Sequence, residues 1–295
     1  MKNIFHGLGI ALVTPFKQNG EIDYDALKRL IEYQIENGAD FFAILATTGE
    51  CPCLSTEEKN ELTETIISVV DGRVPILKYC GGNNTAAVVE EIKQTNWKGI
   101  DGILSICPYY NKPSQEGLYQ HFKAIAEATT LPIMIYNVPG RVGTGILPAT
   151  VARLHKEYPH ICAIKEASGN VLIASEIKRL MPDDDFMVYS GDDGLTLPML
   201  SVGACGVVSV VSHVAGKDMN AMIQAYESGH NHEALRIHQS LADIIKAMFI
   251  TTNPIPVKYA VRKIGLPAGV FNLPMCDPSA EEAAYIDKAL TEYIK

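Results

Sequence analysis

Short apolar runs alternate with one-sided helical segments along most of this chain. The runs have the length of β-strands, while the segments between them repeat apolar residues at helical spacing. Eight such runs can be counted, at residues 8–14, 40–48, 74–80, 102–107, 131–137, 161–166, 185–190 and 206–210. Strands that are apolar on both faces are typical of a parallel sheet covered by helices. The pattern therefore predicts eight successive βα units.

Helix boundary signals support the same alternation. After the first run, Asp23 is predicted to cap the start of a helix and Gly38 to follow its end. After the second run, Ser55 or Thr56 is predicted as the cap, and the acidic residues that follow suit the helix dipole.

Eight strands, each followed by a helix and joined by right-handed crossovers, predict a fold of the α/β class, the (β/α)8 TIM barrel. A doubly wound open sheet is the alternative that periodicity leaves open. The first run is not followed by the G-x-G-x-x-G sequence that would support a dinucleotide-binding sheet. We therefore expect the barrel.

The strand pattern stops after Val210. Residues 219–249 have the pattern of two helices with a turn at Gly229, and the chain ends in another helical pattern. We predict a catalytic barrel domain over residues 1–224 and a C-terminal helical region, packed on the barrel, over residues 225–295.

Composition and charge exclude several classes of protein. The chain has 295 residues, a formal net charge of −9 and no run of basic residues, so it lacks the electrostatic footprint of a protein that binds nucleic acid or anionic lipid. No apolar run approaches the roughly 18 residues of a membrane span, and the N-terminus lacks a signal-peptide pattern. We expect a cytoplasmic protein with no nucleic-acid or membrane partner.

The signals for a metal site are weak. Cys51 and Cys53 form a C-x-C pair without a second pair or a nearby histidine, and the eight histidines show no zinc-binding spacing. Asp192 and Asp193 could hold magnesium or begin a helix, and we favour the helix start. We expect no metal.

Polar residues near the predicted strand ends are candidates for chemistry, because a barrel of this kind builds its active site there. Thr47 and Thr48 precede a glycine, so they could form a turn that binds a carboxylate or could simply end a strand. Tyr109 and Tyr110 could be acid–base groups or packing residues. Arg141 could bind a substrate carboxylate or form a surface ion pair.

Lys165 is the most unusual candidate, because the run "ICAIKE" places it within a predicted buried strand. One interpretation is that its side chain reaches solvent at the strand end. The other is a desolvated, partly neutral amine that attacks a carbonyl group to form a Schiff base. Tyr136 ends the preceding strand, and neighbouring strands lie about 4.8 Å apart, so the hydroxyl and the amine could meet at the barrel mouth.

Six ordered motifs resemble the dihydrodipicolinate synthase family of the class I aldolase superfamily, which includes N-acetylneuraminate lyase. They are TTGE, PYYNKPSQEGLYQHF, IYNVPGRVG, IKEASGN, SGDD and NPIPVK, and the resemblance covers essentially the whole chain. It implies a TIM barrel with a C-terminal helical region, assembled as a homotetramer of tight dimers. The implied reaction condenses pyruvate with L-aspartate 4-semialdehyde in lysine and diaminopimelate biosynthesis, without a cofactor.

The resemblance also implies a role for each matching residue. Lys165 resembles the Schiff-base lysine and Tyr136 the proton donor and acceptor. Thr47 and Tyr110 resemble the rest of the proton relay, with Tyr110 reaching across the dimer interface into the neighbour's site. The other matches are substrate-binding positions, namely Thr48 and Val208 for pyruvate, Gly191, and Arg141 for the carboxylate of the semialdehyde.

Two departures from the family pattern stand out. Tyr79 and Cys80 occupy positions of smaller residues, which leaves the packing there open. Where lysine-inhibited members carry two histidines and a glutamate, this chain has Thr56, Lys59 and Ala87. We therefore expect weak or absent inhibition by lysine.

Two alternative functions are compatible with parts of this pattern. Another pyruvate-dependent aldolase or lyase of the superfamily, acting on N-acetylneuraminate or a keto-deoxy sugar acid, would share the lysine and the tyrosine. Arg141 and the tyrosine pair favour a small carboxylated aldehyde instead. A non-catalytic pyruvate-binding scaffold would be expected to lack one of Thr47, Tyr110, Tyr136 and Lys165, and all four are present.

Overall fold

Eight parallel strands form a closed barrel in which each strand neighbours the next along the chain. The computed structural model describes residues 4–182 and 186–294. The strands are β1 (Gly7–Ala11), β2 (Phe41–Ile44), β3 (Ile76–Tyr79), β4 (Gly102–Ile106), β5 (Ile133–Asn137), β6 (Ile161–Glu166), β7 (Met187–Ser190) and β8 (Gly206–Ser209). The predicted (β/α)8 TIM barrel is confirmed, and closure of the strand order excludes the open sheet.

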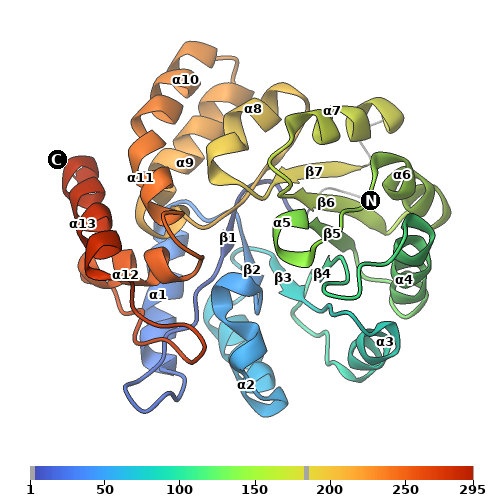
Figure 1. Cartoon of the computed structure of the whole chain (residues 1–295), viewed down its shortest axis with the longest axis horizontal. Helices are drawn as coiled ribbons and strands as arrows, with labels where there is room; N and C mark the ends of the chain where they lie inside the picture. Colours follow the sequence, from blue (N-terminus) through green and yellow to red (C-terminus); the bar gives the residue numbers. More distant parts are fainter. Residues whose placement is uncertain (1–3, 183–185, 295) are drawn as a thin grey trace. The chain divides into compact units, whose positions relative to one another are not determined.

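Helices alternate with the strands and continue after the last one (Figure 1). Those before or between strands are α1 (Tyr24–Glu36), α2 (Thr56–Val70), α3 (Thr85–Gln94), α4 (Gln115–Glu127), α5 (Pro139–Val142), α6 (Pro148–Glu157), α7 (Val171–Leu180) and α8 (Thr196–Ser201). After β8 come α9 (Ser212–Glu227), α10 (Asn231–Ser240), α11 (Ala242–Met248), α12 (Ile255–Lys263) and α13 (Ala280–Ile294). Short 3-10 turns occur at η1 (Thr47–Gly49), η2 (Cys51–Cys53) and η3 (Asp193–Leu195).

Some sequence predictions fall outside the described residues. Asp185, which begins the predicted run 185–190, is one of them. Residues 1–3 of the predicted region 1–224 and residue 295 of the predicted region 225–295 are others. The predicted boundary between these regions falls inside α9, and the division stays a prediction. Within the described ranges, no helix combines the length and the apolar character that crossing a membrane requires.

The predicted helix boundaries are confirmed. The Asp23 side chain accepts a hydrogen bond from Ala26 N at 2.9 Å, and Gly38 follows the end of α1 with a φ of 96°. Ser55, rather than Thr56, caps α2 and exchanges hydrogen bonds with Glu58.

The second predicted strand is shorter than the run 40–48. β2 stops at Ile44 because Leu45 takes a φ of 58°, which lies outside the β region. Thr47, Thr48 and Gly49 then form the turn η1 instead of continuing the strand. The hydrophobic pattern could not reveal this change of backbone direction.

The chain divides into two compact units, and the first is formed by Ile76–Val208 with the short segment before Gly7. In this unit β4, β5, β6 and β7 pair in parallel and lie side by side in Figure 1. The register places Tyr136 of β5 and Tyr189 of β7 on either side of Lys165. Every residue of β6 is buried, so the lysine belongs to a fully enclosed strand.

The second unit contains Gly7–Pro75 and the chain from Ser209 onward. Here β1 pairs with β2, and a partly buried polar cluster fixes α9 to the segments beside them. The Asn220 side-chain amide donates to the Gly38 carbonyl at 2.7 Å and to the Asp40 carboxylate at 3.0 Å. Asp40 also accepts from Leu8 N at 2.7 Å. Helix packing in this unit therefore depends on hydrogen bonds as well as apolar burial.

His213, near the start of α9, is fully buried in the second unit. Its Nε2 accepts a hydrogen bond from Val13 N at 3.2 Å, and its Nδ1 donates to the Val210 carbonyl at 2.9 Å. An imidazole with one accepting nitrogen is neutral, and burial lowers the pKa of His213 to about 4.

We predict that His213 makes the protein less stable in mild acid. The unfolded chain binds this proton near its ordinary pKa of about 6.5, whereas the folded chain resists protonation, so the free energy of unfolding falls as the pH drops below that value. Between about pH 7 and pH 5, His213 should account for a loss of about 2 kcal/mol. Urea unfolding of wild type, His213→Gln and the exposed control His232→Gln measures this. The pH dependence should be smaller in His213→Gln only, and equal pH dependence in all three proteins would contradict the prediction.

Candidate active site

Lys165 and Tyr136 form the centre of the candidate site in the first unit. Both side chains are 5% exposed, and Lys165 Nζ lies 4.4 Å from the centre of the Tyr136 ring. Their backbones are direct partners in the pairing of β5 with β6. This burial excludes the interpretation in which the lysine reaches solvent.

Burial changes the acidity of the lysine. Removing an ammonium group from water disfavours its charged form, and this desolvation lowers the pKa of Lys165 to about 8. The Asp193 carboxylate acts in the opposite direction, and the positive charge of Arg141 adds to the lowering. About a tenth of the amine is therefore unprotonated at pH 7, far more than for a lysine with an ordinary pKa.

Gly191, directly after β7, leaves room for the lysine side chain. A Cβ at this position would lie 3.1 Å from Cγ and Cε of Lys165 and 2.6 Å from Cβ of Ala167. The Gly191 amide also donates to the Glu166 carbonyl at 2.8 Å, which holds the backbone in place. Glycine is required here because β6 and the segment after β7 approach each other closely.

Asn137 and Glu166 form a polar pair between β5 and β6, one residue beyond Tyr136 and Lys165. The Asn137 amide donates to Glu166 Oε2 at 2.7 Å, and Glu166 Oε1 accepts from Ser168 N at 2.7 Å. Asn137 Oδ1 accepts from Ile146 N at 3.2 Å, so the pair also fixes the chain after α5. Burial raises the pKa of Glu166, while the hydrogen bonds from Asn137 and Ser168 lower it in part.

Sequence reasoning missed this pair and also the effect of Asp193 on the lysine. Asn137 and Glu166 stand directly after Tyr136 and Lys165, and this adjacency was the available signal. Of the aspartate doublet, Asp192 accepts from Gly194 N at 2.9 Å and caps η3, as predicted for a helix start. Asp193 is instead fully buried, and its charge acts on the lysine. In the part of the chain that the structure describes, no group of three or more His, Cys, Asp and Glu side chains could hold a metal ion.

The other predicted residues of the first unit differ in exposure. Val208 is 1% exposed on β8, whereas Arg141 is exposed on the short helix α5. Tyr110 is 89% exposed, and its backbone takes a φ of 70° while its amide donates to the Val142 carbonyl at 3.4 Å. In a single chain its ring is presented to solvent, unlike the buried Lys165 and Tyr136.

Thr47 and Thr48 belong to the second unit. Both lie in η1, and Thr48 is 3% exposed. The Thr48 hydroxyl accepts a hydrogen bond from the side-chain amide of Asn253 at 3.0 Å. The turn that the sequence suggested is therefore present.

The unusual pair at the end of β3 is accommodated in the first unit. Cys80 is fully buried, and its amide donates to the Leu104 carbonyl at 3.0 Å. Tyr79 is partly exposed at the last position of β3. The parallel pairing of β3 with β4 continues through Tyr79.

A TIM barrel that carries a buried lysine of lowered pKa on one strand and a tyrosine on the next has the groups that a barrel enzyme with a lysine nucleophile requires. A sequence model of the Dihydrodipicolinate synthetase family matches residues 4–293. The chain belongs to this family, which confirms the resemblance seen in its motifs.

Individual relatives agree. The chain is 46% identical over 288 residues to the 4-hydroxy-tetrahydrodipicolinate synthase of Bacillus subtilis, covering 98% of this chain and 99% of the relative. It is 47% identical over 272 residues to the enzyme of the same name from Desulforamulus reducens, covering 92% of each. Among solved structures, a dihydrodipicolinate synthase from Thermotoga maritima superposes with a TM-score of 0.95 at 40% identity, covering 98% of this chain and 99% of the other.

We predict that Gly191→Ala displaces Lys165 and impairs catalysis. The added methyl group meets Ala167 and the lysine stem at distances that require movement, so we expect a loss of about 1–3 kcal/mol in the free energy of unfolding. Turnover should fall by at least about 10-fold, because small displacements of a nucleophile are costly. Gly140→Ala is the matched control, since a Cβ there meets nothing within 4 Å. Wild-type turnover in Gly191→Ala would show that the close approach does not matter.

Proposed function

We propose that this chain is a 4-hydroxy-tetrahydrodipicolinate synthase, a lyase of lysine and diaminopimelate biosynthesis. It would condense pyruvate with L-aspartate 4-semialdehyde through a Schiff base on Lys165. The observation that carries the proposal is the burial of Lys165 beside Tyr136 in a barrel whose relatives bear this name.

The first step uses the neutral amine of Lys165. Its nitrogen adds to the ketone carbon of pyruvate, water leaves, and an iminium ion remains on the lysine. A pKa of about 8 favours this step near neutral pH, because more of the amine is unprotonated than for an exposed lysine. Tyr136, whose ring lies against the amine, is the proposed donor and acceptor of the protons that this step moves.

The second step forms the new carbon–carbon bond. The iminium withdraws electrons, a proton leaves the pyruvate methyl group, and the resulting enamine attacks the aldehyde carbon of the semialdehyde. The developing alkoxide takes a proton, for which we propose a relay of Tyr136, Thr47 and Tyr110. The amine of the second substrate then closes the ring and releases Lys165. The sequence of steps requires neither a metal nor an organic cofactor.

The remaining predicted residues are proposed to bind the substrates. Thr48 and Val208 would contact pyruvate, and Gly191 would leave space around the iminium because its own position cannot hold a side chain. Arg141, which is exposed on α5, is proposed to bind the semialdehyde carboxylate through two parallel hydrogen bonds.

The proposal includes an assembly and a location. We propose a homotetramer of tight dimers in which Tyr110 completes the relay of a neighbouring subunit, in the cytoplasm. The exposure of 89% and the left-handed backbone of Tyr110 support a partner, because an aromatic ring held outward on an unfavourable conformation gains nothing within its own chain.

We predict that borohydride reduction in the presence of pyruvate attaches pyruvate covalently to Lys165. Mass spectrometry of the digested protein should locate the adduct on the peptide that contains Lys165, and Lys165→Ala should form no adduct. Lys156→Ala, a change at a lysine in α6, is the matched control and should be labelled like wild type. An adduct in Lys165→Ala would remove the central assignment.

The same preparation distinguishes the alternatives. Turnover of pyruvate with L-aspartate 4-semialdehyde is expected, and cleavage of N-acetylneuraminate is not. The reverse preference would indicate another lyase of the superfamily. An adduct without turnover of either substrate would indicate a pyruvate-binding scaffold.

We predict weak or absent inhibition by lysine. The positions that match the inhibitor site of lysine-sensitive members hold Thr56, Lys59 and Ala87, and no carboxylate among them can pair with the ammonium group of the ligand. Calorimetry with free lysine should show no tight binding, and turnover should be little changed at millimolar lysine. Tight binding would contradict this prediction.

A further inference from the structure

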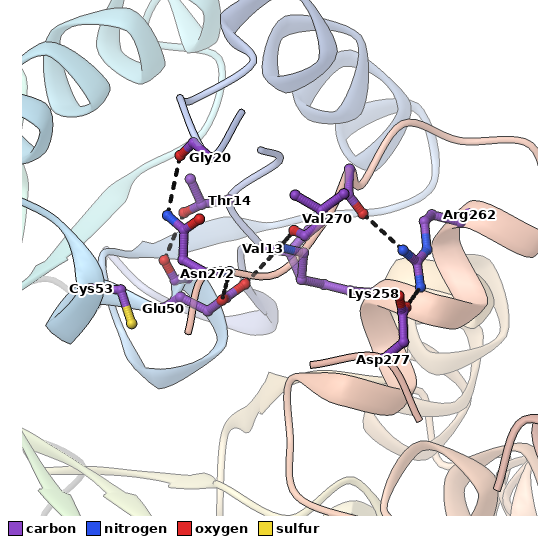
Figure 2. Close-up of polar contacts among 12 residues, drawn as sticks. Val13, Thr14, Gly20, Glu50, Cys53, Lys258, Arg262, Val270, Asn272 and Asp277 are labelled. Atoms are coloured by element: carbon purple, nitrogen blue, oxygen red, sulfur yellow. Dashed lines mark hydrogen bonds and ion pairs between the residues drawn. The ribbon is translucent and has the colours of Figure 1, made fainter. Parts of the chain in front are cut away.

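Glu50, the residue directly after the Thr47–Gly49 turn, forms a buried ion pair with Lys258 inside the second unit. Lys258 Nζ lies 2.6 Å from Glu50 Oε1, and the two side chains are 0% and 1% exposed (Figure 2). The same ammonium group donates to the Val270 carbonyl at 2.6 Å. It also lies over the rings of Phe16 and Phe271, 4.5 and 4.9 Å from their centres. Lys258 is thus enclosed by one carboxylate, one carbonyl and two aromatic faces.

Glu50 is tied to the turn through its backbone and to the C-terminal region through its side chain. Its amide donates to the Thr47 carbonyl at 3.1 Å, while its Oε2 accepts from Asn272 N at 3.2 Å. The φ and ψ angles of Glu50 are 53° and 32°, in the left-handed region that is unfavourable for a residue with a side chain. Such a conformation persists only where surrounding contacts hold it.

The C-terminal region reaches this turn at a second point. Asn253, two residues before α12, donates its side-chain amide to the Thr48 hydroxyl at 3.0 Å, and Lys258 lies within α12 itself. Arg262, one turn further along α12, donates to the Gly269 carbonyl and pairs with Asp277, which fixes the loop that carries Val270 and Asn272 (Figure 2). One helix and its flanking loops therefore hold both the hydroxyl of Thr48 and the carboxylate of Glu50.

Stability alone is a poor reason for such a pair. Desolvating two charges costs several kcal/mol per ion, and apolar residues of similar volume often give equal or greater stability. Burial lowers the pKa of Lys258, with Glu50 acting in the opposite direction, so desolvation is significant here. What an apolar replacement cannot supply is a fixed direction for the Glu50 side chain and hence for the turn before it.

We propose that Glu50, Lys258 and Asn253 are positioning residues that set the orientation of the Thr47 and Thr48 hydroxyls. The C-terminal region thereby controls how this turn binds pyruvate and relays its proton, although Glu50, Lys258 and Asn253 need not touch substrate. This inference rests on the proposed function, in which the two threonines act on substrate.

The test removes both charges at once, so that neither is left buried and unpaired. Glu50→Gln with Lys258→Met keeps the side-chain lengths and an acceptor for Asn272 N. We expect the KM for pyruvate to rise and kcat to fall, each by ~10-fold or more, while thermal unfolding stays near that of wild type. Borohydride trapping on Lys165 should still occur, at higher pyruvate concentrations.

The matched control removes an exposed ion pair that joins α12 to α13. Lys263 and Asp287 lie 2.9 Å apart with side chains 45% and 41% exposed, so Lys263→Met with Asp287→Asn should leave both kinetic constants unchanged. A third variant, Asn253→Leu, removes the hydrogen bond to Thr48 without changing any charge and should raise the KM for pyruvate more than it changes the unfolding temperature. If the double variant Glu50→Gln with Lys258→Met, here called the charge-free variant, does not fold, the kinetics of Asn253→Leu test the inference instead.

Each result has one meaning. Wild-type KM and kcat in the folded charge-free variant, or in Asn253→Leu when the other does not fold, would overturn the inference and leave the proposed function intact. A wild-type protein that neither traps pyruvate nor turns over would overturn the proposed function, and this inference with it. Altered kinetics with an intact fold, absent from the control pair, would support the positioning role.

Discussion

Desolvation of one ammonium group is the constraint on which the first unit depends. A buried lysine is unfavourable unless it is neutral or paired, and the charge of Lys165 is only partly compensated. Asp193 is close enough to influence the charge, yet burial prevails, and the pKa falls to about 8. The desolvation of the lysine is unavoidable at this position, because every residue of β6 is buried. The amine gains its reactivity from the same packing that stabilises the unit.

Two kinds of contact keep that amine in place. The first is steric, since Gly191 approaches the lysine stem so closely that no side chain fits there. The second is polar, since Asn137 and Glu166 link β5 to β6 one residue beyond the reactive pair. Tyr136 and Lys165 are thus fixed by their neighbours in sequence as well as by the pairing of their strands. Polar contacts also fix the Thr47–Gly49 turn of the second unit. There the ion pair of Glu50 with Lys258 holds the left-handed backbone of Glu50 in place.

The sequence predicted the strands well where burial is continuous. The run 161–166 coincides with β6, because a strand enclosed on both faces is apolar along its whole length. The run 40–48 placed Thr47 and Thr48 in a strand, whereas they lie in the turn η1. The change of backbone direction at Leu45 depends on a backbone angle that the hydrophobic pattern does not reveal. Glu50 and Lys258 lie 208 positions apart, so no local pattern relates them. Asp192 and Asp193 are chemically identical in the sequence, and only packing distinguishes the partly buried cap from the fully buried charge.

The crowding at Gly191 also limits how an enzyme of this kind can diversify. Any substitution there adds atoms against the lysine, so the pyruvate side of the reaction leaves little freedom for new specificity. Arg141 is different, because it stands exposed on a four-residue helix and can be exchanged without repacking a core. Under the role proposed for Arg141, a change at α5 alters which acceptor aldehyde is bound while the chemistry at Lys165 stays the same. The architecture separates the part of the reaction that evolution must conserve from the part that it is free to change.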